Sequence, residues 1–585
     1  MNEKTYIKGK DSDLESSIKE MSEKLKYLGI DIEEVSAIHP VAFVYSQHIR
    51  DKACHLMFTN GKGSCEKSSL ASALGEYFER LSCNYFFADY YLGEQFGSDD
   101  FVHYPNEKWF EVQDEALPEG LLNEELWAYY NPNDELHPAQ IFDTNSGVGE
   151  RGICALPFIS QRDKRRVYFP VNIIGNLYVS NGMSAGNTKN EARVQALSEI
   201  YERYVKNKVI AQEISLPLIP QEVISRYPHI QESLHELESY GYHLRLADAS
   251  LGGKYPVISV TLINPKDGSV FASFGAHPCF EVALERTVTE LLQGRSLDMF
   301  DDFQIPTFNS AEVADTQNLE EHFINATGLI SYNFFRKSSD YDFVDWDYES
   351  NTENEFEYLS AIAHDDGLDI YIADYEYLGV YACRIIIPSM SEIYPVDDLM
   401  WSNNNEGAYF REAILSLKNL SHEDMQSVLE NLEEGEHNDM LKVAEFIGVI
   451  PDEKSVWESL QIGELKAMLY LALQEYESAK EWVTWCNHIG NYDEKRSSLY
   501  QCLDALLEIK LDNKDLDEYE TSLALMYCDE SLLACKNILS AKECFYGLHS
   551  PGLSLKGFAQ HQKLLEAYSK IHEVKRKYFN NIIFL

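Results

Sequence analysis

The sequence predicts an α+β protein in which two related α/β half-domains enclose a binding site and an all-helical domain follows. Three observations support this prediction. A helical motif with a row of glutamates occurs twice, and strand-like and helix-like segments alternate over residues 1–405. From residue 406 to residue 585 nearly every segment has helical periodicity. We therefore expect two domains, 1–405 and 406–585.

The second copy of the motif begins a predicted helix at Thr188. Thr188 suits the N-cap, and Glu191 three residues later completes a capping-box sequence. Apolar side chains form one arc of this helix, and Glu191, Gln195, Glu199 and Glu202 form a stripe on the other side. Thus three carboxylates and an amide share one face.

Such a stripe is electrostatically unfavourable by itself, because like charges three positions apart on a helix repel. Two carboxylates about 6 Å apart cost roughly 3 kcal/mol at an effective dielectric of about 20. A divalent cation reverses the sign of this energy, and Mg²⁺ prefers a few carboxylates together with phosphates. The alternative is a solvated acidic face of an amphipathic helix, which is common.

A repeat of the pattern favours the cation site. The segment Ser72-Ala-Leu-Gly-Glu76-Tyr-Phe-Glu79-Arg80 has the same signature, and an Asn-Gly pair precedes both copies. A third predicted helix carries Arg286 and Glu290, which are one turn apart. A repeat at this spacing indicates duplicated half-domains that face each other. Two opposed acidic stripes require cations between them.

With these three motifs in this order, the chain resembles the YcaO family over most of its length. The resemblance implies a YcaO-type fold of duplicated half-domains that encloses a site for ATP and Mg²⁺. The implied Mg²⁺ ligands are Glu76, Glu79, Glu191, Glu199 and Glu202. The implied ATP-binding residues are Lys10, Ser17, Ser72, Ser184, Gln195, Arg203, Arg286 and Glu290.

The family resemblance also implies a reaction. Relatives activate a peptide amide oxygen with ATP, and a stand-alone bacterial member is associated with β-methylthiolation of a small-subunit ribosomal protein. We therefore expect a Mg-ATP-binding protein that activates or assists modification of a peptide or protein substrate. Azoline-forming relatives end in a proline-rich tail, whereas this chain ends Asn-Asn-Ile-Ile-Phe-Leu585, so nucleotide binding is better supported than azoline formation.

Two other functions remain open from the sequence. In one, the chain is a non-catalytic accessory protein that docks a radical methylthiotransferase or a ribosomal partner, with ATP structural or regulatory. In the other, it binds no ATP and is an acidic repeat scaffold. No nucleophile with an adjacent base is evident, so positioning and electrostatics would carry any catalysis.

Bulk composition narrows the partners and the compartment. The net charge of −47 argues against nucleic acid and anionic membrane surfaces, which require basic footprints. No apolar stretch approaches a membrane span and the first residues lack a signal-peptide pattern, so we expect a cytoplasmic protein. The 11 cysteines contain no C-x-x-C pair and indicate structural thiols.

The remaining elements follow in chain order. We expect a first helix over 11–28, capped by Ser12 and Glu15, whose start places Lys10 and Ser17 near phosphate or, alternatively, in solvent. Asn60–Ser64 suits a turn better than an anion-binding loop. His277 suits either a substrate contact or a structural histidine. Further segments are an aromatic core run (84–91), strands (42–48, 54–59, 168–176, 243–247, 257–263, 270–274, 369–373, 381–387), a helix (221–240) and a polar loop (302–317).

The helical domain contains one segment, 462–482, that is typical of a tetratricopeptide helix–turn–helix unit, with weaker echoes at 497–512 and 518–537. Helical repeats bury their faces against neighbours, so this domain suits dimer contacts or partner docking. We expect a homodimer.

Overall fold

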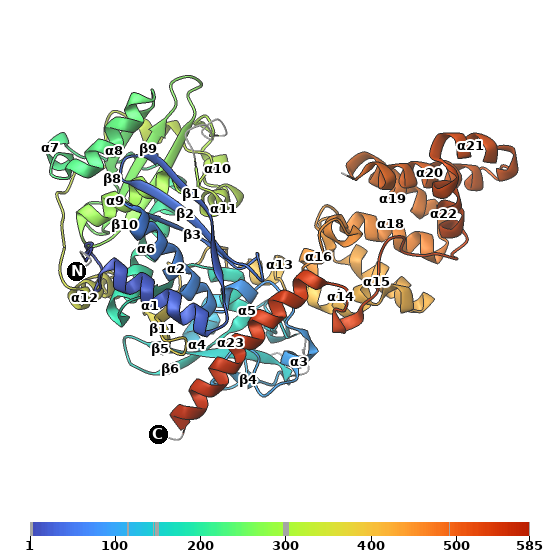
Figure 1. Cartoon of the computed structure of the whole chain (residues 1–585), viewed down its shortest axis with the longest axis horizontal. Coiled ribbons are helices and arrows are strands. Elements are labelled where there is room, and N and C mark those ends of the chain that lie inside the picture. Colours follow the sequence, from blue (N-terminus) through green and yellow to red (C-terminus); the bar gives the residue numbers. More distant parts are fainter. Residues whose placement is uncertain are drawn as a thin grey trace.

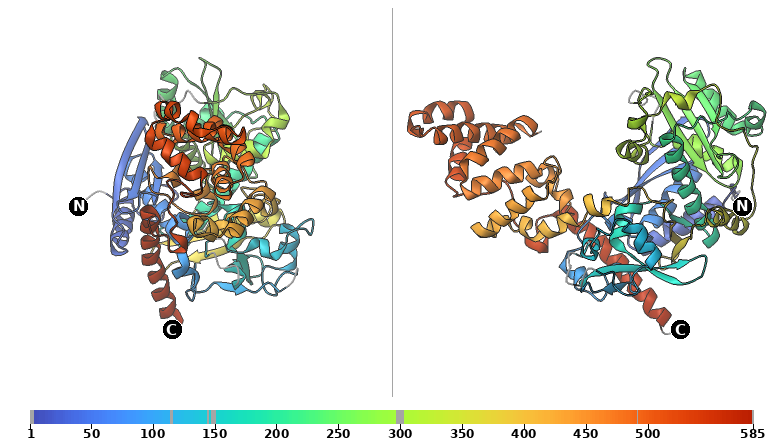
Figure 2. Two further views of the ribbon diagram at one scale, coloured as in Figure 1. Left: turned by 90° about the vertical axis from the view of Figure 1, so that its right-hand side faces the viewer. Right: turned by 180° about the vertical axis from the view of Figure 1, so that it is seen from behind.

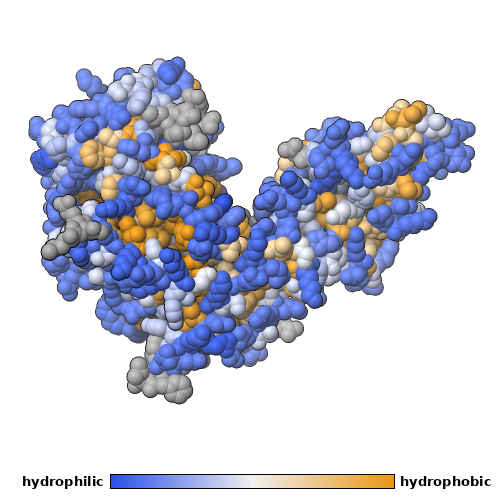
Figure 3. Space-filling model, viewed as in Figure 1, coloured by the Kyte–Doolittle hydropathy of each residue, from blue (hydrophilic) through white to orange (hydrophobic). Residues whose placement is uncertain are grey.

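The computed structural model describes residues 4–113, 116–143, 145–146, 151–295, 303–490 and 492–583. The chain forms an α/β body and a helical arm that projects from it, separated by a notch on the face shown in Figure 3 (Figures 1 and 3). The expected loop at 302–317 begins one residue outside the described part, and the last two residues also lie outside it.

Three antiparallel sheets build the α/β body. The two outer sheets have the orders β1-β2-β3 and β10-β9-β8, and the central sheet has the order β4-β5-β11-β12-β7 with β6 paired to β5. The outer strands are β1 (Ile32–Val41), β2 (Val44–Asp51), β3 (Phe58–Gly63), β8 (His243–Asp248), β9 (Val257–Ile263) and β10 (Val270–Ala276). The central strands are β4 (Lys108–Phe110), β5 (Ile153–Ser160), β6 (Arg166–Pro170), β7 (Met183–Gly186), β11 (Tyr371–Tyr375) and β12 (Tyr381–Ile386). The mixed class that the sequence predicts is confirmed.

Each motif helix directly follows a strand. α2 (Glu66–Ser82) follows β3, α6 (Lys189–Ala211) follows β7, and α9 (Phe280–Leu291) follows β10. α2 packs against both β3 and β7, α6 packs against both β10 and β7, and α9 contacts β10 and β3. α2 and α6 therefore meet at β7, an edge strand of the central sheet, and α9 joins the two outer sheets through β10 and β3.

The segment Asn60–Gly63 is part of β3, so the predicted turn is wrong there. Gln47 of β2 pairs with Gly61 and Tyr45 pairs with Gly63. A Cβ on Gly61 would lie 2.0 Å from the Ser69 carbonyl oxygen of α2. Glycine is required because the helix crosses the strand at backbone distance, and this close approach has no local signature that separates it from a turn.

Other local predictions need correction for local reasons. The helix predicted over 221–240 is broken into α7 (Gln221–Ile224) and α8 (Pro228–Ser239), since Pro228 lacks the N–H that would continue the first segment. The strand predicted over 168–176 ends at Pro170 and continues as α5 (Val171–Ile173) and a π-helical turn. The first helix, α1 (Leu14–Tyr27), is capped by Asp13, whose carboxylate accepts the Ser16 N–H at 2.9 Å.

The shorter helices complete the two bodies. In the α/β body they are α3 (Gly93–Gly97), α4 (Glu124–Tyr130), α10 (Ser310–Val313), α11 (Thr316–Ile324), α12 (Thr352–Asp365) and α13 (Asp398–Trp401). The arm consists of α14 (Glu406–Leu415), α15 (His422–Glu434), α16 (Val443–Phe446), α17 (Val456–Ser459), α18 (Ile462–Leu473), α19 (Tyr476–Ile489), α20 (Glu494–Leu511), α21 (Glu520–Tyr527) and α22 (Asp529–Leu539). None of the helices in the described residues has both the length and the apolar character to cross a membrane.

The arm has its own core. The helix pairs α18–α19 and α19–α20 pack side by side, and α22 packs on α20. Inside this stack, the buried carboxylate of Glu464 pairs with Arg496 and accepts the Tyr500 hydroxyl at 2.5 Å. The helical class of this part is confirmed, and its tetratricopeptide character stays a prediction.

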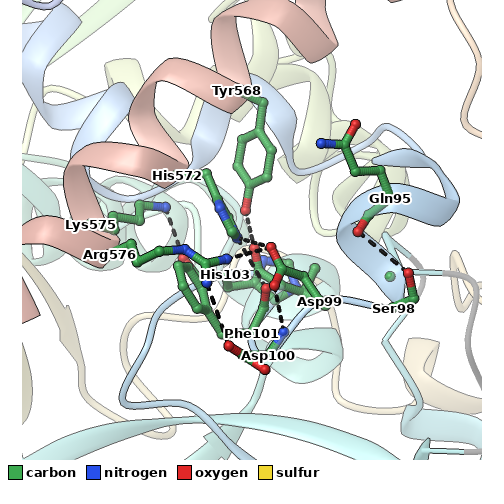
Figure 4. A network of polar contacts seen from close by, with 12 residues as sticks. Gln95, Ser98, Asp99, Asp100, Phe101, His103, Tyr568, His572, Lys575 and Arg576 are labelled. Atoms are coloured by element: carbon green, nitrogen blue, oxygen red, sulfur yellow. Dashed lines mark hydrogen bonds and ion pairs between the residues drawn. The ribbon is translucent and has the colours of Figure 1, made fainter. Parts of the chain in front are cut away.

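The last helix, α23 (Ala559–Ile583), leaves the arm and lies along the α/β body (Figures 1 and 2). Its polar contacts are drawn in Figure 4. The His572 ring lies 3.0 Å from the Phe101 carbonyl oxygen, and the buried Lys575 ammonium donates to the His103 carbonyl at 2.8 Å. Arg576 pairs with Asp99 at the surface. These contacts fasten the arm to the α/β body.

His561 marks the start of this junction. It is fully buried, its Nε2 lies 2.7 Å from the Tyr91 carbonyl, and its Nδ1 accepts the Ile450 N–H at 3.1 Å. The Ile450 contact requires the neutral ring. Burial, with Arg411 nearby, lowers the pKa of His561 from 6.5 to about 4, although the Tyr91 carbonyl opposes this change.

The His561 environment predicts a pH-dependent stability. Between pH 6.5 and pH 4 the His561 ring is protonated in the unfolded chain and neutral in the folded chain. The contribution of His561 to the free energy of unfolding is therefore lost as the pH falls from 6.5 to 4. The full change is about 3 kcal/mol. Chemical denaturation monitored at α23 should show it, and His561→Gln should flatten the pH dependence in this window. An unchanged slope in the variant would contradict the assignment.

Candidate functional site

The motif helices bring their acidic rows together. Glu199 of α6 interacts electrostatically with Glu76 and Glu79 of α2, and Glu202 of α6 interacts with Arg286 of α9. Each helix turns an apolar face to the sheets, for example Leu197 and Ile200 of α6, which are fully buried. The opposite faces therefore meet between the half-domains. This is the arrangement that the repeated motif predicts.

Burial and repulsion within the cluster raise the pKa values of its glutamates. Burial raises the pKa of Glu79 well above normal, and the charges of Glu199 and Glu76 raise it further. Burial also raises the pKa of Glu76, against the effect of Arg80, and the pKa of Glu202, against the effect of Lys62. The side chains of Glu76 and Glu199 keep 26% and 22% of their surface exposed. A ligand can therefore reach carboxylates that protein otherwise surrounds.

Basic residues offset part of this charge. Arg80 pairs with Glu76 at 2.5 Å and Arg203 pairs with Glu199 at 2.7 Å, each within its own helix. Both guanidinium groups keep one buried nitrogen without a hydrogen-bond partner, Arg80 Nε and Arg203 Nη1. Phosphate oxygens are acceptors that could complete the bonding of these two donors.

Lys62 is a site residue that the sequence interpretation missed. It lies in β3 between the two glycines, pairs with Glu290 of α9, and is close to Glu202. Burial lowers its pKa to about 8, although Glu202, Glu199 and Glu76 oppose this change. Its signal was available, since Lys62 stands between glycines before the first motif, but the turn interpretation gave it no role in the site.

Arg286 and Glu290 are not a simple surface pair. The Arg286 guanidinium donates to the Ala276 carbonyl at 3.2 Å, and the Ala276 N–H donates to Glu202 at 3.2 Å. Burial lowers the pKa of Arg286, against the attraction of Glu202 and Glu199. Glu290 pairs across the interface with Lys62. Both motif residues of α9 therefore join the acidic cluster.

A second group surrounds Glu191 at the start of α6. Lys10 pairs with Glu191 at 3.3 Å, and the Asp11 N–H donates to it at 2.9 Å. The Ser17 hydroxyl donates to Asn187 at 2.7 Å, and Asn187 donates to Glu191. Burial disfavours the Glu191 charge, but Lys10 and the Asp11 N–H outweigh burial and lower its pKa. Ser17 is therefore buried in this group, whereas Lys10 pairs with Glu191 from an exposed position.

Glu191 does not complete a capping box in this structure. The Thr188 hydroxyl caps α6 by accepting the Glu191 N–H at 3.2 Å. The Glu191 carboxylate is instead occupied by Asp11, Asn187 and Lys10. It is 3% exposed, far less than Glu76 or Glu199.

His277 links the two groups. Its Nδ1 accepts the Cys279 N–H at 3.0 Å, and a Cβ on Gly9 would lie 2.8 Å from its Nε2. Burial lowers its pKa well below normal, and Arg286 and Lys10 lower it further. The histidine is therefore neutral, and its ring lies between Gly9 and the start of α9. This position favours the structural interpretation of His277.

The remaining predicted residues have fewer contacts. Ser184 is fully buried in β7. Ser72 and Gln195 are half-buried, and neither side chain makes a hydrogen bond within the described residues. Their polar groups remain available to a ligand.

The donor set fits Mg²⁺ bound together with phosphates. Carboxylate oxygens are the ligands that Mg²⁺ prefers, and it usually takes one or two from the protein while phosphates and waters fill the other positions. The site glutamates are not among the described groups of three or more ligand residues that converge within 4.8 Å. Protein atoms alone therefore do not form a closed cage here.

The repulsion predicts a stabilising substitution. Glu79→Gln removes a carboxylate that burial and two like charges disfavour, so we expect about 1 kcal/mol more stability without metal. Denaturation in EDTA measures this change. The control is Glu23→Gln, which removes an exposed carboxylate in the weak Lys19 pair on α1 and should change stability little. A less stable Glu79→Gln protein would contradict the repulsion.

Comparisons with known proteins give matches in both parts of the chain. The YcaO family model, described as the ATP- and Mg²⁺-binding YcaO cyclodehydratase, matches residues 60–391. A second model, the YcaO cyclodehydratase C-terminal domain, matches residues 407–577. Together they cover most of the α/β body and most of the helical part.

Relatives of known sequence match over nearly the whole chain. The ribosomal protein S12 methylthiotransferase accessory factor YcaO of Escherichia coli is 51% identical over 98% of this chain and 99% of its own length. An uncharacterised protein of Haemophilus influenzae is 50% identical over 99% of this chain and 100% of its own.

Solved structures give more distant matches. YcaO from Methanopyrus kandleri bound with AMPPCP and Mg²⁺ aligns with a TM-score of 0.42 at 16% identity, over 69% of this chain and 97% of that one. A heterocyclase in complex with substrate and cofactor aligns with a TM-score of 0.42 at 17% identity, over 68% of this chain and 56% of that one. Both family models match this chain, and two relatives are 50% and 51% identical to it over nearly its whole length. This chain therefore belongs to the YcaO family.

Proposed function

We propose that this chain binds Mg-ATP between α2, α6 and α9 and uses it to support modification of a protein substrate. The observation that carries the proposal is the meeting of Glu76, Glu79 and Glu199 from two helices, with the pKa of Glu79 raised well above normal by burial and by the other two. A chain keeps such repulsion in a partly exposed cluster when a bound cation relieves it.

The residues divide into two roles in this proposal. Glu76, Glu79, Glu191, Glu199 and Glu202 are the candidate Mg²⁺ ligands. Basic and polar side chains would contact the nucleotide: Lys10, Ser17, Lys62, Ser72, Ser184, Gln195, Arg203, Arg286 and Glu290. Ser184 takes part only through a rearrangement, because it is fully buried.

Bound Mg-ATP would supply a phosphoryl group for activating an amide or carbonyl oxygen of the substrate. The chain's own contribution is electrostatic. Lys62 and Arg286 concentrate positive charge beside the carboxylates, where phosphate charge develops, and a half-buried site makes such charges effective. The neutral His277 holds the Lys10 segment against α9.

The substrate is proposed from the E. coli relative. The name of that protein makes it an accessory factor of the ribosomal protein S12 methylthiotransferase. We infer that this chain likewise supports β-methylthiolation of ribosomal protein S12, in the cytoplasm and as a homodimer. The same name favours a second candidate, a non-catalytic docking protein for a radical methylthiotransferase in which ATP is structural or regulatory.

Glu199→Gln tests the nucleotide site. Glu199 touches both acidic rows, so its loss should weaken Mg-dependent binding of a non-hydrolysable ATP analogue at least tenfold in calorimetry, while circular dichroism stays unchanged. Glu23→Gln should bind like the wild-type chain. Wild-type protein that binds no nucleotide would leave the acidic scaffold as the function. Nucleotide binding that is equally tight in EDTA would overturn the assignment of the glutamates as Mg²⁺ ligands.

The rate of ATP hydrolysis distinguishes the two candidate functions that include ATP binding, the enzyme and the docking protein. An enzyme should hydrolyse Mg-ATP faster when the protein substrate is added, and Glu199→Gln should abolish this rate. Binding without turnover under any added substrate supports the docking protein. In a deletion strain, mass spectrometry should find S12 without its methylthio group, restored by the wild-type gene. Unchanged S12 would overturn the substrate assignment for both.

A further inference from the structure

A cavity of about 270 Å³ lies outside the acidic cluster, where the end of β11 meets the end of α23. Five aromatic side chains line it: Tyr104, Tyr375, Tyr377, Tyr578 and Phe579. None of the proposed nucleotide or metal residues is among its lining. The cavity is slightly smaller than common ligand sites, which start at about 300 Å³, so it suits one long side chain better than a cofactor.

The aromatic cluster already binds a cation on its buried side. The Lys575 ammonium lies 4.2 Å from the centre of the Tyr104 ring and 5.6 Å from that of Tyr377. Tyr104 stacks on Tyr375 with 5.0 Å between ring centres. Aromatic faces attract ammonium and guanidinium groups, and the effect grows with desolvation.

Two carboxylates line the same cavity, and they differ in partners. Asp374 is neutralised by Lys189 at 2.8 Å and Arg193 at 2.9 Å. Glu376 is exposed, and no ion pair joins it to a cation in the described ranges. Burial and the Glu376 charge raise the pKa of Tyr578, which places this carboxylate beside a cavity ring. The cavity thus combines aromatic walls with one carboxylate that has no cation.

We infer that this cavity binds a lysine or arginine side chain of a basic protein. Its aromatic walls would cover the aliphatic stem, and Glu376 would pair with the charged end. The net charge of −47 attracts basic proteins from a distance, and the cavity adds a local position for one side chain. The inference rests on the proposed function in that it identifies the protein substrate as basic.

Two residues that line the cavity also contact the acidic helix α2. The hydroxyls of Tyr104 and Tyr377 donate to the carbonyl of Ser82, the last residue of α2, at 2.5 Å and 2.8 Å. α2 carries Glu76 and Glu79. A side chain in the cavity would therefore rest against residues that hold the end of this helix, which brings its protein close to the nucleotide-binding body.

The probe is a labelled Gly-Ser-Arg-Ser-Gly peptide, with the same peptide carrying citrulline in place of arginine, measured by fluorescence anisotropy on the full chain at physiological ionic strength. The wild-type chain should bind the arginine peptide at least fivefold more tightly. Glu376→Gln should remove this preference. Glu23→Gln, which removes another exposed carboxylate, should keep it.

The ring contribution has a separate control. Tyr578→Ala should weaken arginine-peptide binding at least threefold, and Tyr578→Phe, which keeps the ring, should restore it. Equal loss in Glu376→Gln and Glu23→Gln, or wild-type affinity in Tyr578→Ala, would overturn the inference and leave general acidity as the cause of binding.

Nucleotide binding measured on the same preparations separates this inference from the proposed function. If the wild-type protein discriminates between the peptides but binds no Mg-ATP, the proposed function is wrong and the inference about the cavity stands. If it binds Mg-ATP but binds both peptides equally, the inference about the cavity is wrong and the proposed function stands.

Discussion

The electrostatic repulsion between Glu79 of α2 and its neighbours Glu76 and Glu199 constrains the rest of this structure. Apolar packing against three sheets forces α2 and α6 together, and their acidic faces then have nowhere else to lie. Four basic residues, Lys62, Arg80, Arg203 and Arg286, offset the charge incompletely, as the raised pKa values of Glu76, Glu79 and Glu202 indicate. The site is thus stable enough to form and remains short of positive charge, which is the condition for binding a cation.

Glycine makes this proximity possible. A Cβ on Gly275 of β10 would lie 2.9 Å from the Ala283 carbonyl of α9, as one on Gly61 would clash with α2. Each motif helix therefore lies directly on its own strand, and Lys62 projects from a strand beside the carboxylates. A side chain at these positions would push the helices outward and separate the charges that form the site.

The helical arm is joined to the site through its own last helix. α23 returns along the α/β body, and its Lys575 donates to Asn84, which follows the end of α2, and to the His103 carbonyl. Tyr104 and Tyr377 connect the same region to the end of α2. The arm is thus connected to the acidic helix through α23, although the two bodies have separate cores.

The sequence by itself determined the acidic rows, the apolar arcs, the N-cap at Thr188 and the change to helices after residue 405, because these depend on neighbours three or four positions apart. Tertiary structure alone decided that Lys62 lies in a strand beside Glu290, that His277 is wedged against Gly9, and that α23 covers the α/β body. Those contacts join residues from 200 to nearly 500 positions apart. Strand pairing and helix packing bring these distant residues together. A pattern of neighbouring residues does not encode which distant residues will meet.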